Sequence, residues 1–268
     1  MLTEENLLII TKTYPMPSSD YREHTCVAAI NDKGELRRLY PVPFRLLSAE
    51  RQFKRWQWIS AKIEKSSDKR PESHRIDTDS IKIINKKTLG WPERLSILRP
   101  HIFKNLGALE ANRVSNGQSL GIIQPNNFQL VIEEEENKNW TESELANLTR
   151  EGLFDPEEVK NRSVLKKMPY RFYYEYECIE NGKLVKYRHL ITDWEVGMLY
   201  FNCVKDYKSS WENKFREKLE AEFTTKKELF FIMGTVHRFP DQWLIVGLIY
   251  PSKKMIMQEP LFRPQLNA

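Results

Sequence analysis

Cations and aromatic side chains alternate closely between residues 37 and 75 of this sequence. A single strand of nucleic acid needs both from a protein, because cations bind its phosphates and flat rings stack on its bases. The pattern therefore predicts a nucleic-acid-binding surface. The predicted binding residues are Arg37, Arg38, Tyr40, Phe44, Arg45, Lys54, Arg55, Lys62, Lys65, Arg70, His74 and Arg75, together with His237 and Arg238 in a turn near the C-terminus.

At least one of the rings Tyr40, Phe44, Trp56 and Trp58 should be exposed if this block stacks on bases. Phe44 is the first choice, since it follows two prolines that break a strand and precedes Arg45. Strand alternation would place Trp56 and Trp58 on one face and Arg55 on the other. The alternative is that Tyr40 and the tryptophans belong to the core and the cations form a solvated rim.

Charge is unevenly distributed along the chain, whose formal net charge is +5. Residues 33–104 contain 18 Lys and Arg against 8 Asp and Glu, whereas residues 105–165 contain 5 against 11. A basic segment followed by an acidic one favours one face that binds a polyanion. An ordinary solvated surface is the alternative.

His189, Asp193 and Glu195 form a second group, at a predicted strand-to-helix junction. They have the residue types of an acid–base pair or a metal site, as in a metal-dependent nuclease or a nucleotide-processing enzyme. In the simpler interpretation, Asp193 or Thr192 caps the helix that starts at Trp194, and Glu195 complements its dipole. The common nucleotide-binding and hydrolase motifs are absent from the sequence. We therefore favour a protein without catalytic residues, metal or cofactor.

The elements that would position these residues are mostly strands. Five strands with short connections fall within about 85 N-terminal residues, which is typical of a small barrel of the OB type. Residues 170–178 and 184–191 flank an Asn-Gly turn and predict a hairpin, and residues 229–236 and 243–250 predict two closing strands. We predict a mainly β fold with added helices (α+β), in which helical segments connect two OB-like barrels. The expected ranges are 1–90 for the first barrel, 91–165 for a helical and acidic connection that contributes strands at 120–133, and 166–268 for the second barrel with inserted helices at 194–223.

Composition limits the class of protein. Hydrophobic residues make up 40% of the chain, enough for a sizeable core, and no apolar run reaches the roughly 20 residues of a membrane helix. The N-terminus is acidic where a signal peptide is basic. Three widely spaced cysteines (Cys26, Cys178 and Cys203) argue against a disulfide framework. We expect a soluble, cytoplasmic protein that does not bind membranes.

Four stretches together resemble the dual OB-containing domain family. They are residues 38–45 (RLYPVPFR), residues 70–75 (RPESHR), residues 189–195 (HLITDWE), and residues 234–251, which end in WLIVGLIYP. The resemblance implies two OB-like barrels in one chain, nucleic-acid recognition and a role in prokaryotic conflict or anti-phage systems. Some members carry cysteines before the histidine stretch, as if for a metal, whereas only Cys178 stands there in this chain.

The leading hypothesis is a nucleic-acid-binding recognition or sensor protein that acts beside a separately encoded effector. The competing hypotheses are the enzyme that uses His189, Asp193 and Glu195, and a protein-interaction module without affinity for nucleic acid. The sequence leaves open whether the ligand is DNA or RNA, single or double stranded.

Overall fold

The structure, a computed structural model, describes residues 1–84, 88–150 and 157–258. Its contacts divide the chain into two compact units. The first unit contains Met1–Thr88 and Ile132–Arg171, and the second contains Leu89–Val131 and Phe172–Ala268. The expected connecting region 91–165 is thus divided between the units. The reason is that its strands complete the second barrel, whereas residues 132–171 pack with the first.

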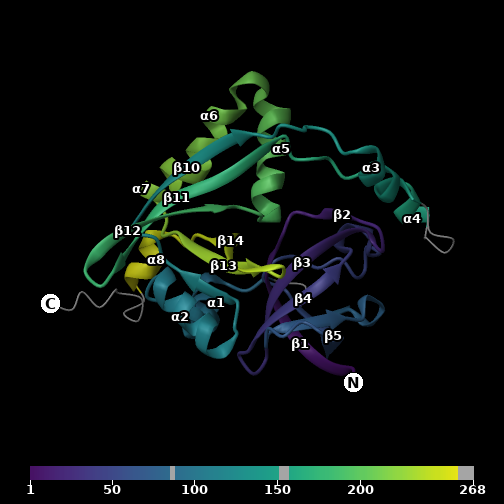
Figure 1. The fold of residues 1–268 in the computed structure, drawn as a ribbon, viewed down its shortest axis with the longest axis horizontal. Helices are drawn as coiled ribbons and strands as arrows, with labels where there is room; N and C mark the ends of the chain where they lie inside the picture. Colours follow the sequence, from purple (N-terminus) through teal and green to yellow (C-terminus); the bar gives the residue numbers. More distant parts are fainter. Residues whose placement is uncertain (85–87, 151–156, 259–268) are drawn as a thin grey trace. The chain divides into compact units, whose positions relative to one another are not determined.

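A closed barrel of five strands forms the centre of the first unit (Figure 1). Its strands are β1 (Thr3–Lys12), β3 (Arg22–Asn31), β4 (Leu36–Val42), β5 (Trp58–Lys65) and β6 (Ser73–Ile76). Their order around the barrel is β1-β3-β4-β6-β5, and pairing of β5 with β1 closes it. All of these pairs are antiparallel except β4 with β6. The predicted small OB-like barrel is therefore confirmed for this unit.

The barrel closes because β1 pairs with two strands, β5 and β3. Its first half, Thr3 to Leu8, pairs with β5, and its second half, Leu7 to Lys12, pairs with β3 after a bulge between Ile9 and Thr11. Apolar side chains then alternate into one shared core. The core contains Leu7, Ile9, Val27, Ala29, Leu39, Val42, Leu47, Phe53, Ile59, Ala61, Ile63 and Ile81.

Four short elements surround this barrel. A 3₁₀ turn at Phe44–Leu46 follows β4, and β7 (Lys82–Ile83) pairs with β5 after a second 3₁₀ turn at Thr78–Ser80. The strand β2 (Met16–Ser18) pairs with β3.

Residues 132–150 and 157–171 form an arm of the first unit. The arm carries α3 (Glu142–Thr149) and α4 (Glu157–Lys160), and α3 contacts β2 and β3. Thr141 and Glu144 form a capping box at the start of α3. The Tyr14 hydroxyl donates to the Lys166 carbonyl at 2.8 Å, and Arg162 Nη2 donates to the Leu47 carbonyl at 2.8 Å. The arm is therefore attached to the barrel by directional bonds as well as by packing.

The second unit is built from two sheets and six α-helices within the described residues. One sheet has the order β14-β13-β9-β8 and the other β10-β11-β12. The strands are β8 (Ile102–Phe103), β9 (Leu120–Ile123), β10 (Asn127–Glu134), β11 (Tyr170–Glu180), β12 (Lys183–Leu190), β13 (Phe230–Val236) and β14 (Phe239–Ile249). The helices are α1 (Trp91–Leu98), α2 (Leu106–Asn116), α5 (Trp194–Tyr207), α6 (Trp211–Arg216), α7 (Glu222–Thr225) and α8 (Lys253–Gln258).

The strands of the second unit follow the pairing order of the first barrel. Only three residues, centred on Pro125, separate β9 from β10, so the two act as one bent strand. Its first part pairs with β13 and its second part with β11, as β1 pairs with β5 and β3. A parallel bridge between Ile191 and Ile245 then links the end of β12 to β14. The second predicted OB-like barrel thus has the expected strand order, with α5 to α7 inserted between its third and fourth strands.

Aromatic side chains on the inner face of β11 hold this unit together. Phe172 contacts Phe215 of α6 at a centroid distance of 4.6 Å, and Tyr174 stacks on Phe231 of β13 at 5.1 Å. The Tyr174 hydroxyl is buried and donates to the Leu219 carbonyl at 2.7 Å. The turn that follows β11 uses Asn181 and Gly182, both at positive φ, as the predicted hairpin requires.

Among the described residues, no helix has both the length and the apolar composition needed to cross a membrane.

Candidate nucleic-acid interface

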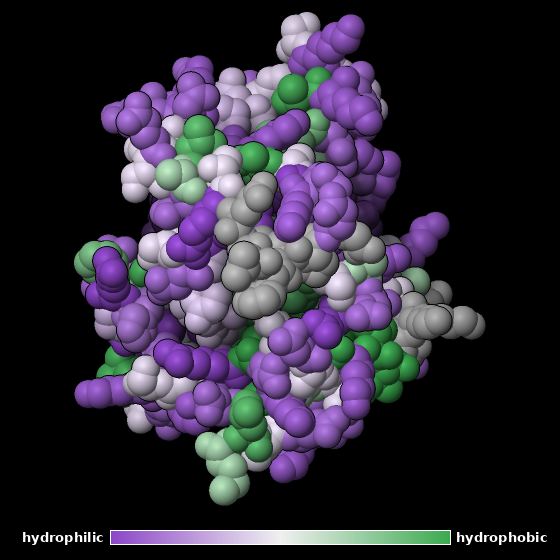
Figure 2. Space-filling model, turned by 90° about the vertical axis from the view of Figure 1, so that its right-hand side faces the viewer, coloured by the Kyte–Doolittle hydropathy of each residue, from purple (hydrophilic) through white to green (hydrophobic). Residues whose placement is uncertain are grey.

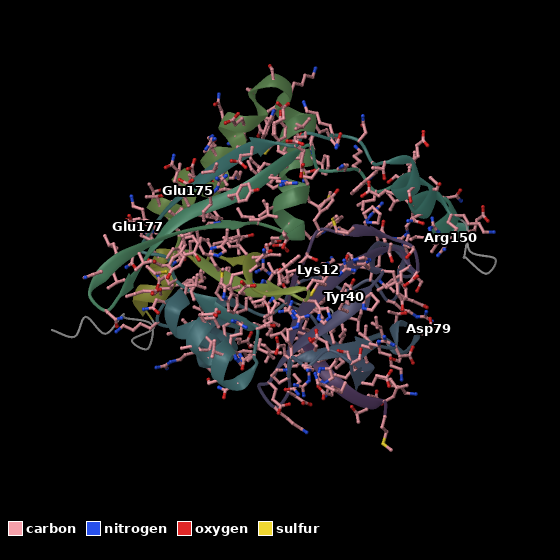
Figure 3. All side chains as sticks on the ribbon, viewed as in Figure 1. Lys12, Tyr40, Asp79, Arg150, Glu175 and Glu177 are labelled. Carbon is pink, nitrogen blue, oxygen red and sulfur yellow. The ribbon has the colours of Figure 1, made fainter. Side chains whose placement is uncertain are left out.

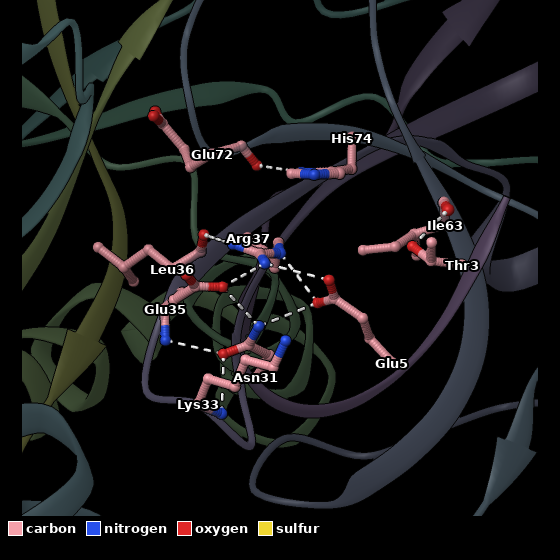
Figure 4. A network of polar contacts seen from close by, with 10 residues as sticks. All are labelled: Thr3, Glu5, Asn31, Lys33, Glu35, Leu36, Arg37, Ile63, Glu72 and His74. Carbon is pink, nitrogen blue, oxygen red and sulfur yellow. Dashed lines mark hydrogen bonds and ion pairs between the residues drawn. The ribbon is translucent and has the colours of Figure 1, made fainter. Parts of the chain in front are cut away.

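Several cations of the basic–aromatic block are held by contacts within the first unit. Arg37 lies at one end of the barrel, where Nε donates to Glu5 Oε2 at 2.9 Å and Nη2 pairs with Glu35 (Figure 4). Burial alone would raise the pKa of Glu5, but hydrogen bonds from Arg37 and Asn31 outweigh it and lower that pKa. Arg37 therefore links β1 to the β3–β4 turn through Glu5 and Glu35.

Three further arginines have similar internal partners. Arg38 is 5% exposed, and its Nη2 lies 3.8 Å from Glu72 Oε1. Arg45 Nη1 donates to Glu23 Oε2 at 2.7 Å. Arg55 is also buried, and its Nε donates to the Ile10 carbonyl at 2.6 Å. These guanidinium groups join segments of the first unit that lie 22 or more residues apart in the sequence.

Lys65 and Arg70 shape the loop between β5 and β6. Lys65 Nζ donates to the carbonyls of Asp68 at 3.1 Å and Ser73 at 3.0 Å. Arg70 Nε donates to Asp68 Oδ2 at 2.7 Å. Burial alone would raise the pKa of Asp68. Hydrogen bonds from Arg70 and Ser73 outweigh burial and hold this pKa well below its usual range. Replacing Lys65 or Arg70 would therefore disturb the loop as well as remove a charge.

The remaining cations of the block are exposed. Lys54, Lys62 and Arg75 make no ion pair with any residue that the structure describes, and the same holds for Lys69 at the tip of the β5–β6 loop. Parallel pairing of Leu39 with His74 places Tyr40 and Arg75 next in line on β4 and β6. This arrangement brings a ring and a cation to neighbouring positions of two adjacent strands.

Of the four candidate rings, Tyr40 is the most exposed, at 46% (Figure 3). It meets His24 edge-on at a centroid distance of 5.1 Å. Phe44, the expected first choice, is half-buried and packs against Phe53 of the barrel core, with Lys12 Nζ 3.5 Å from its ring centre. The 3₁₀ turn after β4 directs Phe44 inward, because residues 43–57 fold back over the end of the barrel.

The tryptophans are not the exposed rings. Trp56 is 6% exposed and has φ 66°, so β5 begins only at Trp58, which is half-buried. The interpretation of these two rings as largely core residues fits their burial.

The histidines and the second basic pair lie in different surroundings. His74 Nδ1 lies 2.9 Å from the Glu72 carbonyl oxygen, and burial lowers the pKa of His74. His237 and Arg238 are exposed in the turn between β13 and β14, in the second unit.

His189 lies on the inner side of β12, among rings. Tyr174 is its cross-strand partner, and the Tyr176 hydroxyl lies 3.1 Å from Nδ1. Burial lowers the pKa of His189 to about 4, so the ring is neutral at pH 7. Such a histidine fits a packing role.

Asp193 is the N-cap of α5. Its Oδ1 accepts from the Glu195 backbone N–H at 2.7 Å, and Oδ2 accepts from the Leu248 N–H at 2.9 Å. The carboxylate is 3% exposed, whereas the Glu195 side chain is exposed. Within the described ranges, no group of three or more His, Cys, Asp or Glu residues could hold a metal ion. The helix-cap interpretation is confirmed for Asp193.

Sequence reasoning did not identify a cavity of about 130 Å³ in the first unit. It lies between the barrel and the arm, and Glu23 of β3 is one of its lining residues. No sequence signal pointed to it, because Glu23 and the arm are more than 100 residues apart.

Two family models match the chain. The Domain of unknown function (DUF8758) matches residues 3–100, and the Domain of unknown function (DUF8757) matches residues 103–266. A search of curated proteins gives no match. The second model covers more than half of the chain, and the chain therefore belongs to the Domain of unknown function (DUF8757) family.

Proposed function

We propose that this chain binds nucleic acid, and single strands in particular, on the outer side of β4, β6 and β5 of the first barrel. The observation that carries the proposal is the exposed Tyr40 ring in line with Arg75, with Lys62 and Lys69 on adjoining elements. Small barrels of this kind bind oligonucleotides on their open strand faces and the neighbouring loops. A ring supplies a base stack and the cations supply phosphate contacts.

Figure 2 shows one face of the molecule coloured by hydropathy. The face drawn in Figure 2 is mostly hydrophilic, and hydrophobic side chains appear on it in small separate groups. Arg37, Arg38, Arg45, Arg55, Lys65 and Arg70 have internal partners, so we assign phosphate binding to the cations that lack such partners among the described residues. The wider role as the recognition component of a prokaryotic conflict system, beside a separately encoded effector, is supported only by the family resemblance of the sequence.

The proposal is tested by replacing Lys62, Lys69 and Arg75 with Gln. Binding of a labelled dT15 oligonucleotide is measured by fluorescence anisotropy at several salt concentrations. We expect weaker binding and a salt slope that falls by about 0.7 for each phosphate that the variant no longer neutralises.

The matched control replaces Lys104, Lys183 and Lys205 with Gln. These three exposed cations of the second unit carry the same total charge. The control should retain the slope of the unmodified protein. Equal slopes for the two triple variants, or no binding of dT15 at low salt, would contradict the proposal.

A further inference from the structure

The cavity between the first barrel and its arm has one acidic group in its lining. Glu23, on β3, is 4% exposed, and its Oε2 accepts from Arg45 Nη1 at 2.7 Å. Its other carboxylate oxygen, Oε1, is buried and has no hydrogen-bond partner among the described residues. An acceptor left in this state costs about 1–3 kcal/mol, so a partner for Oε1 is to be expected.

A second polar group on the same strand is also unsatisfied. Thr25 lies two residues after Glu23, and therefore on the same side of β3. It is 1% exposed, and its hydroxyl has no partner in the described part of the chain. Thr25 does not line the cavity, so Glu23 Oε1 is the orphaned acceptor that the lining offers.

The walls of the cavity suit a flat ring. Leu46 comes from the barrel side, and Leu148, Val164 and Leu165 come from the arm. Arg22, Lys160 and Arg162 line the same cavity and supply positive charge. Its volume of about 130 Å³ is close to the roughly 150 Å³ that accommodates a benzene ring. A six-membered ring therefore fits.

We propose that this cavity receives an unstacked cytosine base, whose N4 amino group donates a hydrogen bond to Glu23 Oε1. The inference rests on the proposed nucleic-acid binding and names the base that the site selects. Cytosine presents an amino donor at the position where thymine and uracil present the O4 acceptor, so the ionised carboxylate attracts one and repels the other. Burial raises the pKa of Glu23 and Arg45 opposes that rise, so the test is made at a pH above neutral. Lys160, which also lines the cavity, is exposed and makes no ion pair with the described residues, so it can contact the phosphate beside the base.

The test compares two labelled 15-mers of equal charge, dT15 and an alternating dT/dC strand, by anisotropy at one low salt concentration. We expect the dC-containing strand to bind at least about fivefold more tightly. In Glu23→Gln, the amide oxygen keeps the contact with Arg45 and the amide NH₂ faces the cavity as a donor. The preference should then disappear or reverse toward thymine.

Two further variants separate the cavity from general effects. Glu64→Gln removes an equal charge on β5 of the same barrel and should leave the preference unchanged. Leu148→Phe fills the cavity from α3 and should abolish the preference without weakening dT15 binding. The melting temperature of each variant is also measured, to show that it is folded.

Two results would overturn the inference while the proposed function stands. One is equal affinity of the unmodified protein for the two strands, as expected if only water fills the cavity. The other is a preference that survives both Glu23→Gln and Leu148→Phe. If neither strand binds at low salt, the proposed function itself fails, and the base site with it.

Discussion

The two barrels share one strand order but differ in how the charges on their outer strands are compensated. On the hairpin of the second barrel, Arg188 Nε lies 3.8 Å from Glu175 Oε1. Lys186 lies opposite Glu177 but makes no ion pair with the described residues, and both glutamates project from β11 (Figure 3). On the first barrel, Lys62, Lys69 and Arg75 make no ion pair with the described residues. A polyanion gains most where cations are not already neutralised. This difference supports the proposed nucleic-acid binding on the first barrel.

The connection between the third and fourth strands also differs. In the first barrel, residues 43–57 cross the barrel end with one 3₁₀ turn. In the second barrel, α5 to α7 occupy this position, and Asp193 fixes the start of α5 to β14. Of the three residues that look catalytic in the sequence, Asp193 thus holds the start of the inserted helices.

Asp193→Ala is expected to have the largest effect on stability. It removes the helix cap and leaves the buried Leu248 N–H without its carboxylate partner. We expect a decrease of about 2–4 kcal/mol in the unfolding free energy, measured by urea denaturation. Nucleic-acid binding under folding conditions should be retained. A protein that cleaves nucleic acid with Mg²⁺ or Mn²⁺, and loses this activity in Asp193→Ala at unchanged melting temperature, would instead establish the enzyme hypothesis.

His189 should make the second barrel sensitive to acid. Its pKa is about 4 in the folded chain, below the usual value near 6.5, because the ring is buried. As pH falls below about 6.5, the unfolded chain binds the proton first, so the unfolding free energy decreases until about pH 4. The full effect is up to about 3 kcal/mol.

The difference between two pH profiles of stability isolates this effect. His189→Gln should show a shallower decline than the unmodified protein between pH 6.5 and 4, because both chains share all other titrating groups. Parallel profiles would contradict the assigned burial.

Tyr40→Ala and Phe44→Ala separate binding from packing on the first barrel. Tyr40 is exposed, so its removal should weaken dT15 binding by about 1–3 kcal/mol without lowering the melting temperature. Phe44 packs on the core, so its removal should lower the melting temperature. The opposite result, with weaker binding in Phe44→Ala and lower stability in Tyr40→Ala, would identify Phe44 as the stacking ring, as the sequence predicted.

Local patterns in the sequence predicted much of the fold. The alternation at 170–178 gave β11 and its inward aromatic residues, and the Asn181–Gly182 pair gave the hairpin. The acid before Trp194 gave the cap of α5. These features depend on neighbours in the sequence, where periodicity and capping preferences act.

Non-local contacts account for what the sequence did not reveal. Arg37, Arg38 and Arg45 looked available, but Glu5, Glu72 and Glu23 compensate them from other strands. The sequence predicted an exposed Phe44 because it follows Pro43. In the structure its ring packs against Phe53. The cavity at Glu23 requires the arm, whose residues are distant in sequence. The spacing of residues along the sequence does not predict these contacts, because they form only when the barrel closes and brings distant segments together.

The smallest expected effect comes from removing the compensation on the second barrel. Glu175→Gln together with Glu177→Gln leaves Arg188 and Lys186 without their cross-strand acids. Exposed ion pairs contribute only about 0.2–1 kcal/mol, so stability should change little. If compensation is what keeps nucleic acid off this hairpin, dT15 affinity at low salt should rise, by no more than about fivefold.

The control for that experiment is Asp206→Asn with Asp241→Asn, which removes the same charge from exposed positions elsewhere in the second unit. A rise in the glutamine variant beyond that of the control would reflect local uncovering of Arg188 and Lys186, since the two variants have equal net charge. If dT15 affinity rises equally in both double variants, net charge alone would explain the difference between the barrels. A rise that persists when Lys62, Lys69 and Arg75 are also replaced would show that the hairpin binds independently. The assignment to the first barrel would then rest on charge compensation and not on the shape of the barrel.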